Sequence, residues 1–374
     1  MAPTLISPAA LRAALGLRDL TEVARGPHAM QALVAGAVAA LRSAWGCEVI
    51  VDRSHPVVTV TENYELLHYP PDAAARDARY TRYVTPATVL RTHATAMVPA
   101  ALRQIAAAGY EDVLLVCPGL VYRRDRIDRQ SVGEPHQMDI WRIRQGRTGA
   151  PDLEEMISLL MQAMLPDHGY RRLATSHPYT TAGLEIEARG PGRWVEVAEC
   201  GLAGPDILDA AGLPPERWSG LAAGIGLDRV LMLRKGIDDI RLLRSEDERV
   251  AGQMLDLAPY RPVSSMPAVR RDLSIAVEAE MSAEELGDRV RAALGPAVDA
   301  VEAVELLGET PPEALPPQAA ARLGIRAGQK NVLVRVVLRH PTRTLTAREA
   351  NELRDGIYAA IHQGSVHQWA SRAE

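Results

Sequence analysis

Apolar residues recur along the chain at intervals that predict helices alternating with short strands. Between residues 28 and 45 they lie three or four positions apart, so that Met30, Leu33 and Leu41 share one buried helical face. Short apolar or alternating runs predict strands, and the Tyr-, His- and Pro-rich segment 57–83 is assigned to strands and loops. The remaining elements predicted in this half are helices over 90–109 and 152–165 and strands over 48–51, 112–117 and 120–123, the last two meeting at Pro118 and Gly119.

The pattern changes after a predicted helix over 247–257, where Pro259 and Pro262 bracket a break. Beyond it a helix over 282–294 begins at Ser282 with Glu285 three residues later, which is typical of a capping box. The order strand, helix, strand, strand, helix predicts a split β-α-β arrangement of ferredoxin-like type. Its other elements are strands over 272–277, 298–307 and 331–340, a helix over 346–362, and a proline-rich inserted loop over 308–328.

The length of 374 residues exceeds what one hydrophobic core usually supports, and the 47% hydrophobic content is enough for two. We therefore expect a domain over residues 1–257, a linker over 258–264 and a domain over 265–374. No apolar run of about 18 residues and no signal-like N-terminus is present, which favours a soluble cytoplasmic protein with no membrane partner. The three cysteines are far apart and odd in number, which argues against a disulfide framework or a zinc cluster.

Phenylalanine is absent from the chain, although ordinary usage would give a chain of this length on the order of fifteen. Of the 42 Lys and Arg residues only two are Lys, which suggests GC-rich coding, but such a bias does not remove Phe. Neutral drift toward Leu, Tyr and Met is one explanation. The other is that this protein must be made correctly when Phe is scarce or when an analogue is loaded in its place.

A basic segment lies near the C-terminal end. From residue 322 to residue 348 there are seven basic side chains and no acidic one, within a chain whose net charge is -5. This local asymmetry suits a phosphate backbone, although a merely solvated basic face is the alternative. Candidate RNA-binding residues are Arg335, Arg339 and Arg343.

The run from Gly220 to Arg241 joins a glycine-rich strand to a helix through Arg229. Gly224 and Gly226 leave space where a flat ring can approach the backbone, and a guanidinium can lie on adenine or pair with phosphate. Close backbone packing is the structural alternative. The run resembles motif 3 of class II aminoacyl-tRNA synthetases, and most closely that of phenylalanyl-tRNA synthetases.

A second segment resembles motif 2 of the same family. The sequence Leu-Val-Tyr-Arg-Arg-Asp over residues 120–125 places the motif's ATP-binding arginine at Arg123, and His136-Gln137-Met138-Asp139 is similar to the family's His-Gln-x-Glu. The resemblance implies that Gln137 and Asp139 hold the substrate's ammonium group and that His136 contributes to the ATP site. An arginine-rich turn in a surface hairpin is the structural alternative, and the joint occurrence of both motifs disfavours it.

The resemblance also supplies pocket residues. Leu-Arg-Thr-His-Ala-Thr over 90–95 is similar to a family segment whose His and final hydroxyl touch the amino acid, and Trp-Val-Glu-Val over 194–197 resembles a strand whose acidic residue holds magnesium. The chain departs from the family where His-Pro-Tyr-Thr over 177–180 replaces Phe-Pro-Phe-Thr, where Glu199 replaces a glycine and where Ala223 replaces an aromatic residue. The pocket candidates are therefore His93, Thr95, His177, Tyr179, Glu199 and Ala223, with Glu196 for the metal.

The resemblance implies an α+β fold: an antiparallel class II synthetase sheet flanked by helices, followed by a ferredoxin-fold anticodon-binding domain as in the single-chain organellar form. It implies ATP-dependent activation of phenylalanine, or of a ring-substituted or more polar relative, with Mg²⁺, and transfer to phenylalanine tRNA. The alternatives are a paralogue that passes the activated amino acid to a small molecule or carrier protein, and a binding module without catalysis. Both a monomer and a homodimer are compatible with the sequence.

Overall fold

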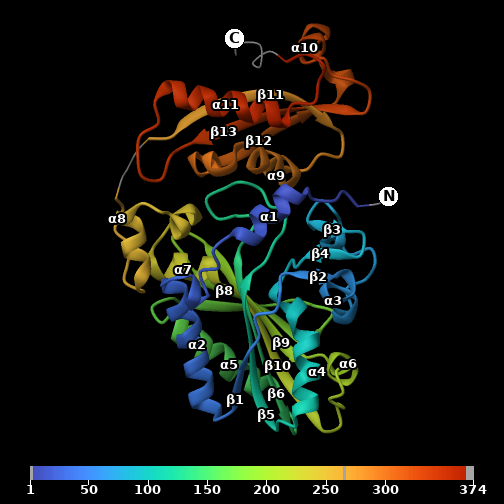
Figure 1. Ribbon diagram of the computed structural model, residues 1–374, viewed down its shortest axis with the longest axis vertical. Coiled ribbons are helices and arrows are strands. Elements are labelled where there is room, and N and C mark those ends of the chain that lie inside the picture. The colour runs from blue at the N-terminus through green and yellow to red at the C-terminus, as the bar shows by residue number, and fades with distance from the viewer. Residues whose placement is uncertain (1–2, 264–266, 368–374) are drawn as a thin grey trace. The chain divides into compact units, whose positions relative to one another are not determined.

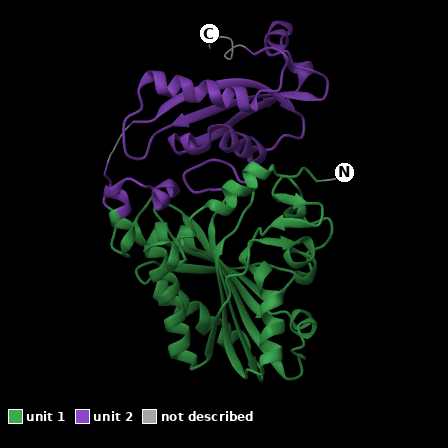
Figure 2. Ribbon diagram, viewed as in Figure 1, with its two compact units in different colours: residues 1–123, 134–238, 252–260 green, residues 124–133, 239–251, 261–374 purple. Residues whose placement is uncertain are grey.

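The computed structural model describes residues 3–263 and 267–367 and divides the chain into two compact units (Figure 2). The first comprises residues 1–123, 134–238 and 252–260, and the second comprises residues 124–133, 239–251 and 261–374. The division at residue 260 falls within the predicted linker over 258–264. Two segments that the sequence places in the first domain, 124–133 and 239–251, are grouped with the second unit instead.

A seven-stranded sheet forms the centre of the first unit, in the order β1-β5-β6-β10-β9-β8-β7 (Figure 1). β1 is parallel to β5 and all other neighbours are antiparallel, as the sequence predicts for this fold class. The strands are β1 (Glu48–Val51), β5 (Asp112–Leu120), β6 (His136–Gln145), β7 (Tyr170–Ala174), β8 (Thr180–Arg189), β9 (Trp194–Ala203) and β10 (Trp218–Gly226).

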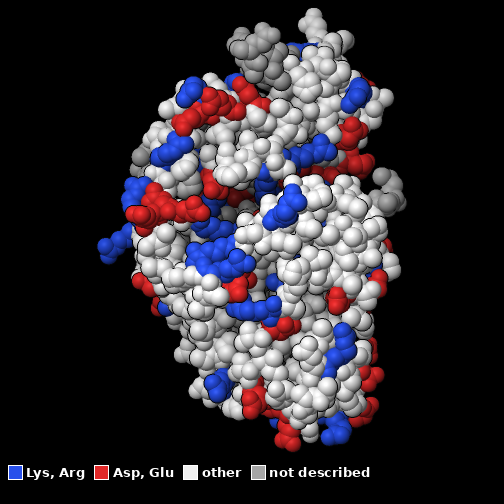
Figure 3. Space-filling model, viewed as in Figure 1, with Lys and Arg blue, Asp and Glu red and all other residues white. Residues whose placement is uncertain are grey.

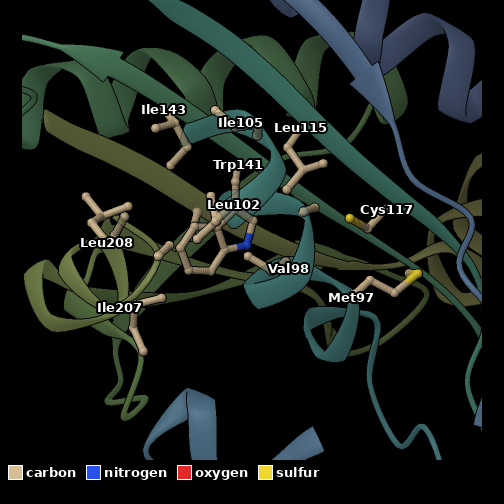
Figure 4. Packing of buried hydrophobic residues seen from close by; sticks show 14 of the residues in the cluster. Met97, Val98, Leu102, Ile105, Leu115, Cys117, Trp141, Ile143, Ile207 and Leu208 are labelled. Atoms are coloured by element: carbon tan, nitrogen blue, oxygen red, sulfur yellow. The ribbon is translucent and has the colours of Figure 1, made fainter. Parts of the chain in front are cut away.

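Helices cover both faces of this sheet (Figure 1). On one side lie α2 (Ala29–Trp45), α5 (Ala150–Met164) and α7 (Leu227–Lys235); on the other lie α4 (Val98–Ala108) and α6 (Pro205–Ala210). The second side is packed around Trp141, which is fully buried among Val98, Leu102 and Ile207 (Figure 4). This core fills the space between the sheet and the helices α4 and α6.

Smaller elements complete the first unit. A three-stranded sheet has the order β2-β4-β3, formed by β2 (Val57–Thr59), β3 (Tyr83–Thr85) and β4 (Thr88–Leu90). The helices beside it are α1 (Pro8–Gly16) and α3 (Val60–Asn63). Cys47, Cys117 and Cys200 are buried free thiols.

The second unit contains β11 (Val269–Glu278), α9 (Ala283–Leu294), β12 (Val301–Thr310), β13 (Gln329–Leu338) and α11 (Ala347–Ile361). Its sheet has the order β11-β13-β12, and both outer strands are antiparallel to β13, so β11, α9 and β12 form a split β-α-β unit. Ser282 and Glu285 cap α9 reciprocally, as predicted, and Thr346 and Glu349 cap α11 in the same way. Residues 264–266, at the end of the predicted linker and the start of the predicted second domain, lie outside the described residues.

The segment 124–133 is bound within this second unit. The Val304 N–H donates to the Ile127 carbonyl at 3.0 Å, and the Ile127 side chain is buried with the core of the β11-β13-β12 sheet. Arg129 pairs with Glu302 at 3.2 Å, and Arg291 donates to the Arg126 carbonyl at 2.8 Å. These contacts explain why a turn between two strands of the first unit clusters with the second.

Several predicted elements were wrong in extent. The helix expected over 90–109 begins only at Val98, because the preceding residues form β4 and a 3-10 turn over Ala94–Met97. The strand expected over 112–117 continues through Pro118 to Leu120 as β5, and the rest of the strand expected over 120–123 is not formed. Pairing with β1 ends at Val116, so the missing N–H of Pro118 faces no partner strand on that side.

Two further predictions failed in the second unit. The loop expected over 308–328 contains α10 (Pro317–Leu323), which begins at a proline and ends at Gly324 with φ 59°. That start and stop signal was present in the sequence. The helix expected over 247–257 is broken into α8 (Glu248–Ala251) and a 3-10 segment over Gly252–Leu255, with a kink at Met254.

Candidate active site

The register of three neighbouring strands brings the principal candidates together. Asp139 on β6 lies opposite Gly224 on β10, and Gly224 lies opposite Glu199 on β9. Residues directly opposite one another on antiparallel strands point to the same face, and glycine leaves the space between the two carboxylates open. This row lines a small cavity together with Trp141, His177, Tyr179 and Thr180, and a separate apolar cavity lies against α5.

Asp139 is a deeply buried carboxyl group with 3% exposure. The Trp141 indole donates to it at 3.4 Å, and Thr95 also interacts with it. Burial is the main cause that raises the Asp139 pKa from 3.8 to about 7, and the nearby Glu199 charge acts in the same direction. A buried carboxylate of this kind requires a cation, and the ammonium group of an amino acid supplies one.

Glu199 and His177 form a second charged group beside the cavity. His177 Nε2 lies 2.9 Å from Glu199 Oε2, and the hydrogen bond from His177 to Glu199 raises the His177 pKa above its usual 6.5. The Glu199 carboxylate therefore has a partner, and that partner is another of the predicted pocket residues.

Aromatic rings line the rest of the site. The Tyr179 ring lies 5.5 Å from His177 and 6.3 Å from Trp141, and Tyr69 lies 6.2 Å from Tyr179. Tyr69 also stacks on His93 with centroids 5.5 Å apart. Sequence reasoning missed Tyr69 and Trp141, although the unusual density of Tyr and His over residues 57–83 was a signal for the first.

His93 and Thr95 lie next to these rings. The nitrogens of the His93 ring are buried and find no hydrogen-bond partner in the part of the chain that the structure describes. Burial lowers the His93 pKa to about 4; the Asn63 backbone opposes this, and the nearby Arg123 charge reinforces it. His93 is thus a neutral imidazole at physiological pH, able to donate or accept toward a ligand.

Gln137 and His136, from the segment that resembles His-Gln-x-Glu, make hydrogen bonds to other parts of the first unit. Gln137 accepts from the Ala94 N–H at 3.1 Å, which fixes the start of the 3-10 turn beside His93. His136 is fully buried: its Nε2 accepts from the Leu20 N–H at 3.0 Å and its Nδ1 lies 3.1 Å from Asp228. The His136 ring is thus enclosed within the fold, between the Leu20 backbone and Asp228.

Arg229 and Glu196 are brought together in the structure. Arg229, in the first turn of α7, donates to Glu196 Oε2 on β9 at 3.0 Å, and both side chains are partly exposed. A guanidinium beside a carboxylate suits a nucleotide held with a cation, since Mg²⁺ usually takes one or two protein carboxylates plus phosphate oxygens. Within residues 3–263 and 267–367, no cluster of three or more metal-ligating side chains is found.

The glycines of the β10 run have different surroundings. A Cβ on Gly220 would lie 2.5 Å from the Arg142 carbonyl oxygen, so this glycine serves close backbone packing. On Gly224 it would lie 3.3 Å from Asp139, and on Gly226 the nearest atom is 3.8 Å away. Ala223 borders the cavity and also the apolar space beneath α5, with 1% exposure.

The three candidate RNA-binding arginines all have carboxylate partners. Arg335 makes two hydrogen bonds to Asp272 at 2.8 and 2.9 Å, Arg339 lies 2.8 Å from Glu302, and Arg343 lies 2.8 Å from Glu349. Figure 3 likewise shows acidic and basic side chains intermingled on the face in view. The basic run in the sequence is therefore largely neutralised by residues from other segments.

Comparison with known proteins agrees with this geometry. A family model described as tRNA synthetases class II core domain (F) matches residues 26–254. The phenylalanine--tRNA ligase alpha subunit of Prochlorococcus marinus (strain MIT 9313) is 34% identical over 227 residues, which cover 54% of this chain and 66% of that relative. That of Nostoc sp. (strain PCC 7120) is 37% identical over 193 residues, covering 51% of this chain and 56% of that relative.

The chain thus spans between about half and two thirds of the length of these curated relatives. A solved structure of Desulfitobacterium hafniense PylSc, a pyrrolysyl tRNA synthetase, aligns over 60% of this chain and 75% of that one, with 14% identity and a TM-score of 0.45. No helix among the described residues is long and apolar enough to cross a membrane.

Proposed function

We propose, from the premise that this chain belongs to the family of class II tRNA synthetase core domains (F), that it activates an aromatic amino acid with ATP and transfers it to phenylalanine tRNA. The amino acid is phenylalanine or a more polar relative. The observation that carries the proposal is the buried Asp139 at the end of an aromatic cavity, because this pairs an ammonium site with a ring site.

Different residues bind different parts of the two substrates of the activation step. Asp139 holds the ammonium group, while Tyr69, His177 and Tyr179 surround the side chain. The substrate carboxylate attacks the α-phosphorus of ATP and pyrophosphate leaves, so negative charge grows on the phosphate oxygens. Arg123, whose charge is close to His93, would oppose that charge.

The second half of the reaction needs no protein nucleophile. A terminal ribose hydroxyl of tRNA attacks the carbonyl carbon of the adenylate, and AMP leaves as the ester forms. Holding the two reactants together and stabilising charge is enough for both steps. Mg²⁺ would neutralise phosphate charge when bound. Glu196 would hold the metal, and the adjacent Arg229 would hold the nucleotide.

The second unit supplies the proposed tRNA contacts, in a cytoplasmic enzyme that acts as a monomer or homodimer. As a ferredoxin-fold anticodon-binding domain it would use Arg335, Arg339 and Arg343, once RNA phosphates replace their carboxylate partners. One observation favours a second candidate function: because these arginines are already neutralised, the activated amino acid can instead pass to a small molecule or carrier protein.

Pyrophosphate exchange followed by tRNA charging tests these functions. We expect exchange with an aromatic amino acid and charging of a phenylalanine tRNA transcript. Arg123→Ala should lower the exchange rate by about a hundredfold or more. Arg172→Ala is the matched control, since Arg172 pairs with Glu154 at the exposed edge of the sheet. Exchange without charging would favour the second candidate, and no exchange with any aromatic amino acid would refute both.

A further inference from the structure

We infer that His177 and Glu199 together select the side chain of the amino acid, and that the preferred substrate carries a neutral ring hydroxyl rather than the bare ring of phenylalanine. The inference rests on the proposed function and specifies its substrate class. The inference is based on the cavity beside Asp139, which is lined by both polar and apolar side chains.

The polar part of the lining is made of groups that a phenyl ring cannot satisfy. Glu199 and His177 both line the cavity, and the members of this 2.9 Å pair keep 38% and 15% of their side chains exposed. Next to them, the Thr180 hydroxyl is buried without a hydrogen-bond partner in the described part of the chain. A bare ring placed here would exclude water from the partly exposed Glu199 carboxylate and would offer it no hydrogen bond in return.

The hydroxyl groups of two tyrosines extend this polar surface. The Tyr69 hydroxyl interacts with that of Tyr179, and Tyr179 in turn interacts with Thr95. The rest of the lining includes the buried apolar side chains of Trp141 and Ala222. An aromatic ring bearing one polar substituent matches both kinds of lining group, whereas an aliphatic or a wholly polar side chain matches only one.

The charges around the cavity decide which polar substituent fits. Asp139 is matched by the substrate's ammonium group, and Glu199 is already matched by His177. A cationic side chain would therefore meet no uncompensated carboxylate, and an anionic one would be repelled by Asp139 and Glu199. A neutral hydroxyl can accept from the His177 N–H and donate to the Glu199 carboxylate at the same time.

The composition of the chain supports the same inference independently. An enzyme that loads a hydroxylated relative of phenylalanine onto phenylalanine tRNA makes every Phe codon ambiguous. This chain contains no Phe, so its own sequence is unaffected by such ambiguity. Neutral drift offers no such link between the missing residue and the pocket.

The test is pyrophosphate exchange by the full chain with phenylalanine, meta-tyrosine and para-tyrosine. We expect kcat/KM for one of the hydroxylated amino acids to exceed that for phenylalanine by at least about tenfold, because a site built to hydrogen-bond a hydroxyl rejects the analogue that lacks it. Glu199→Gln should reduce that ratio. Glu154→Gln, which removes an exposed carboxylate paired with Arg172, should leave the ratio unchanged.

A double variant, His177→Phe with Glu199→Gly, should exchange phenylalanine faster than the wild type. Such a gain cannot result from misfolding, and the thermal midpoint of each variant gives a separate check. Phenylalanine as the best wild-type substrate, or an unchanged ratio in Glu199→Gln, would overturn the role of the pair while leaving the ligase activity standing. Absence of exchange with all three amino acids would overturn both.

Discussion

Replacing Asp139 by Asn should stabilise the protein and damage its activity, because the carboxylate is kept at a cost to the fold. Asp139 is 3% exposed, and burial is the main cause of its raised pKa of about 7, compared with 3.8 for an unperturbed group. At 1.36 kcal/mol for each tenfold change, this difference corresponds to a destabilisation of about 4 kcal/mol when the group is ionised. Asn retains an oxygen that can accept from the Trp141 indole.

The sign of the pH dependence follows from proton binding. The folded protein holds the Asp139 proton up to about pH 7, whereas the unfolded chain loses it near pH 3.8, so stability falls as pH rises between these values. The advantage of Asp139→Asn should therefore be absent below about pH 4, complete above about pH 7, and larger at pH 8 than at pH 5 by about 2 to 3 kcal/mol.

Urea denaturation of both proteins at pH 5 and pH 8 measures this difference, without added amino acid. Between pH 5 and pH 8 the activity of the wild type should rise while its stability falls. The ionised fraction of Asp139 rises from about one in ten at pH 6 to about nine in ten at pH 8, so kcat/KM for the amino acid should rise about tenfold relative to the Asn variant. A variant that is less stable than the wild type at pH 8, or a stability difference that does not vary with pH, would refute the reasoning.

Three further predictions concern the strand, the helix and the second unit. Gly220→Ala should lower the free energy of unfolding by about 2 to 4 kcal/mol, because the new Cβ meets a backbone carbonyl. Gly226→Ala, the control, should leave the free energy of unfolding unchanged within about 0.5 kcal/mol. Equal urea midpoints for the two variants would contradict this prediction. Lys235→Met should destabilise by about 1 to 3 kcal/mol, since buried Lys235 donates to two backbone carbonyls at 2.8 and 2.6 Å, and a wild-type midpoint would exclude that role. Arg343→Ala should weaken tRNA binding evenly across sequences and reduce the slope of affinity against salt by about one, which a salt titration of binding would show or disprove.

Much of the architecture was predictable because it depends on local periodicity and capping. The helix at α2 and the capped helix α9 match their predicted positions within one residue, since apolar spacing and cap residues lie close together in sequence. The extent of β5 was not predictable in the same way. Whether Pro118 ends a strand depends on where the neighbouring β1 stops, and that is a property of the sheet.

Some residues of the candidate site could likewise be suggested from the sequence, and others could not. The family resemblance placed Asp139 and Glu199 among the candidates, and the strand register brings these two together on either side of Gly224. Tyr69 and Trp141 were missed because their positions depend on packing between segments distant in sequence. In the same way, a motif position does not reveal that Leu20 and Asp228 enclose the His136 ring.

By itself the sequence determined the α+β class, the antiparallel sheet and the class II synthetase family. Those properties reside in residue types and spacings that are read one segment at a time. Only the tertiary structure decided that Glu199 is compensated by His177, that Asp139 is held near its point of titration, and that the basic run is neutralised by carboxylates. Charge pairing and desolvation depend on distance in space, and folding sets that distance between residues far apart in the chain.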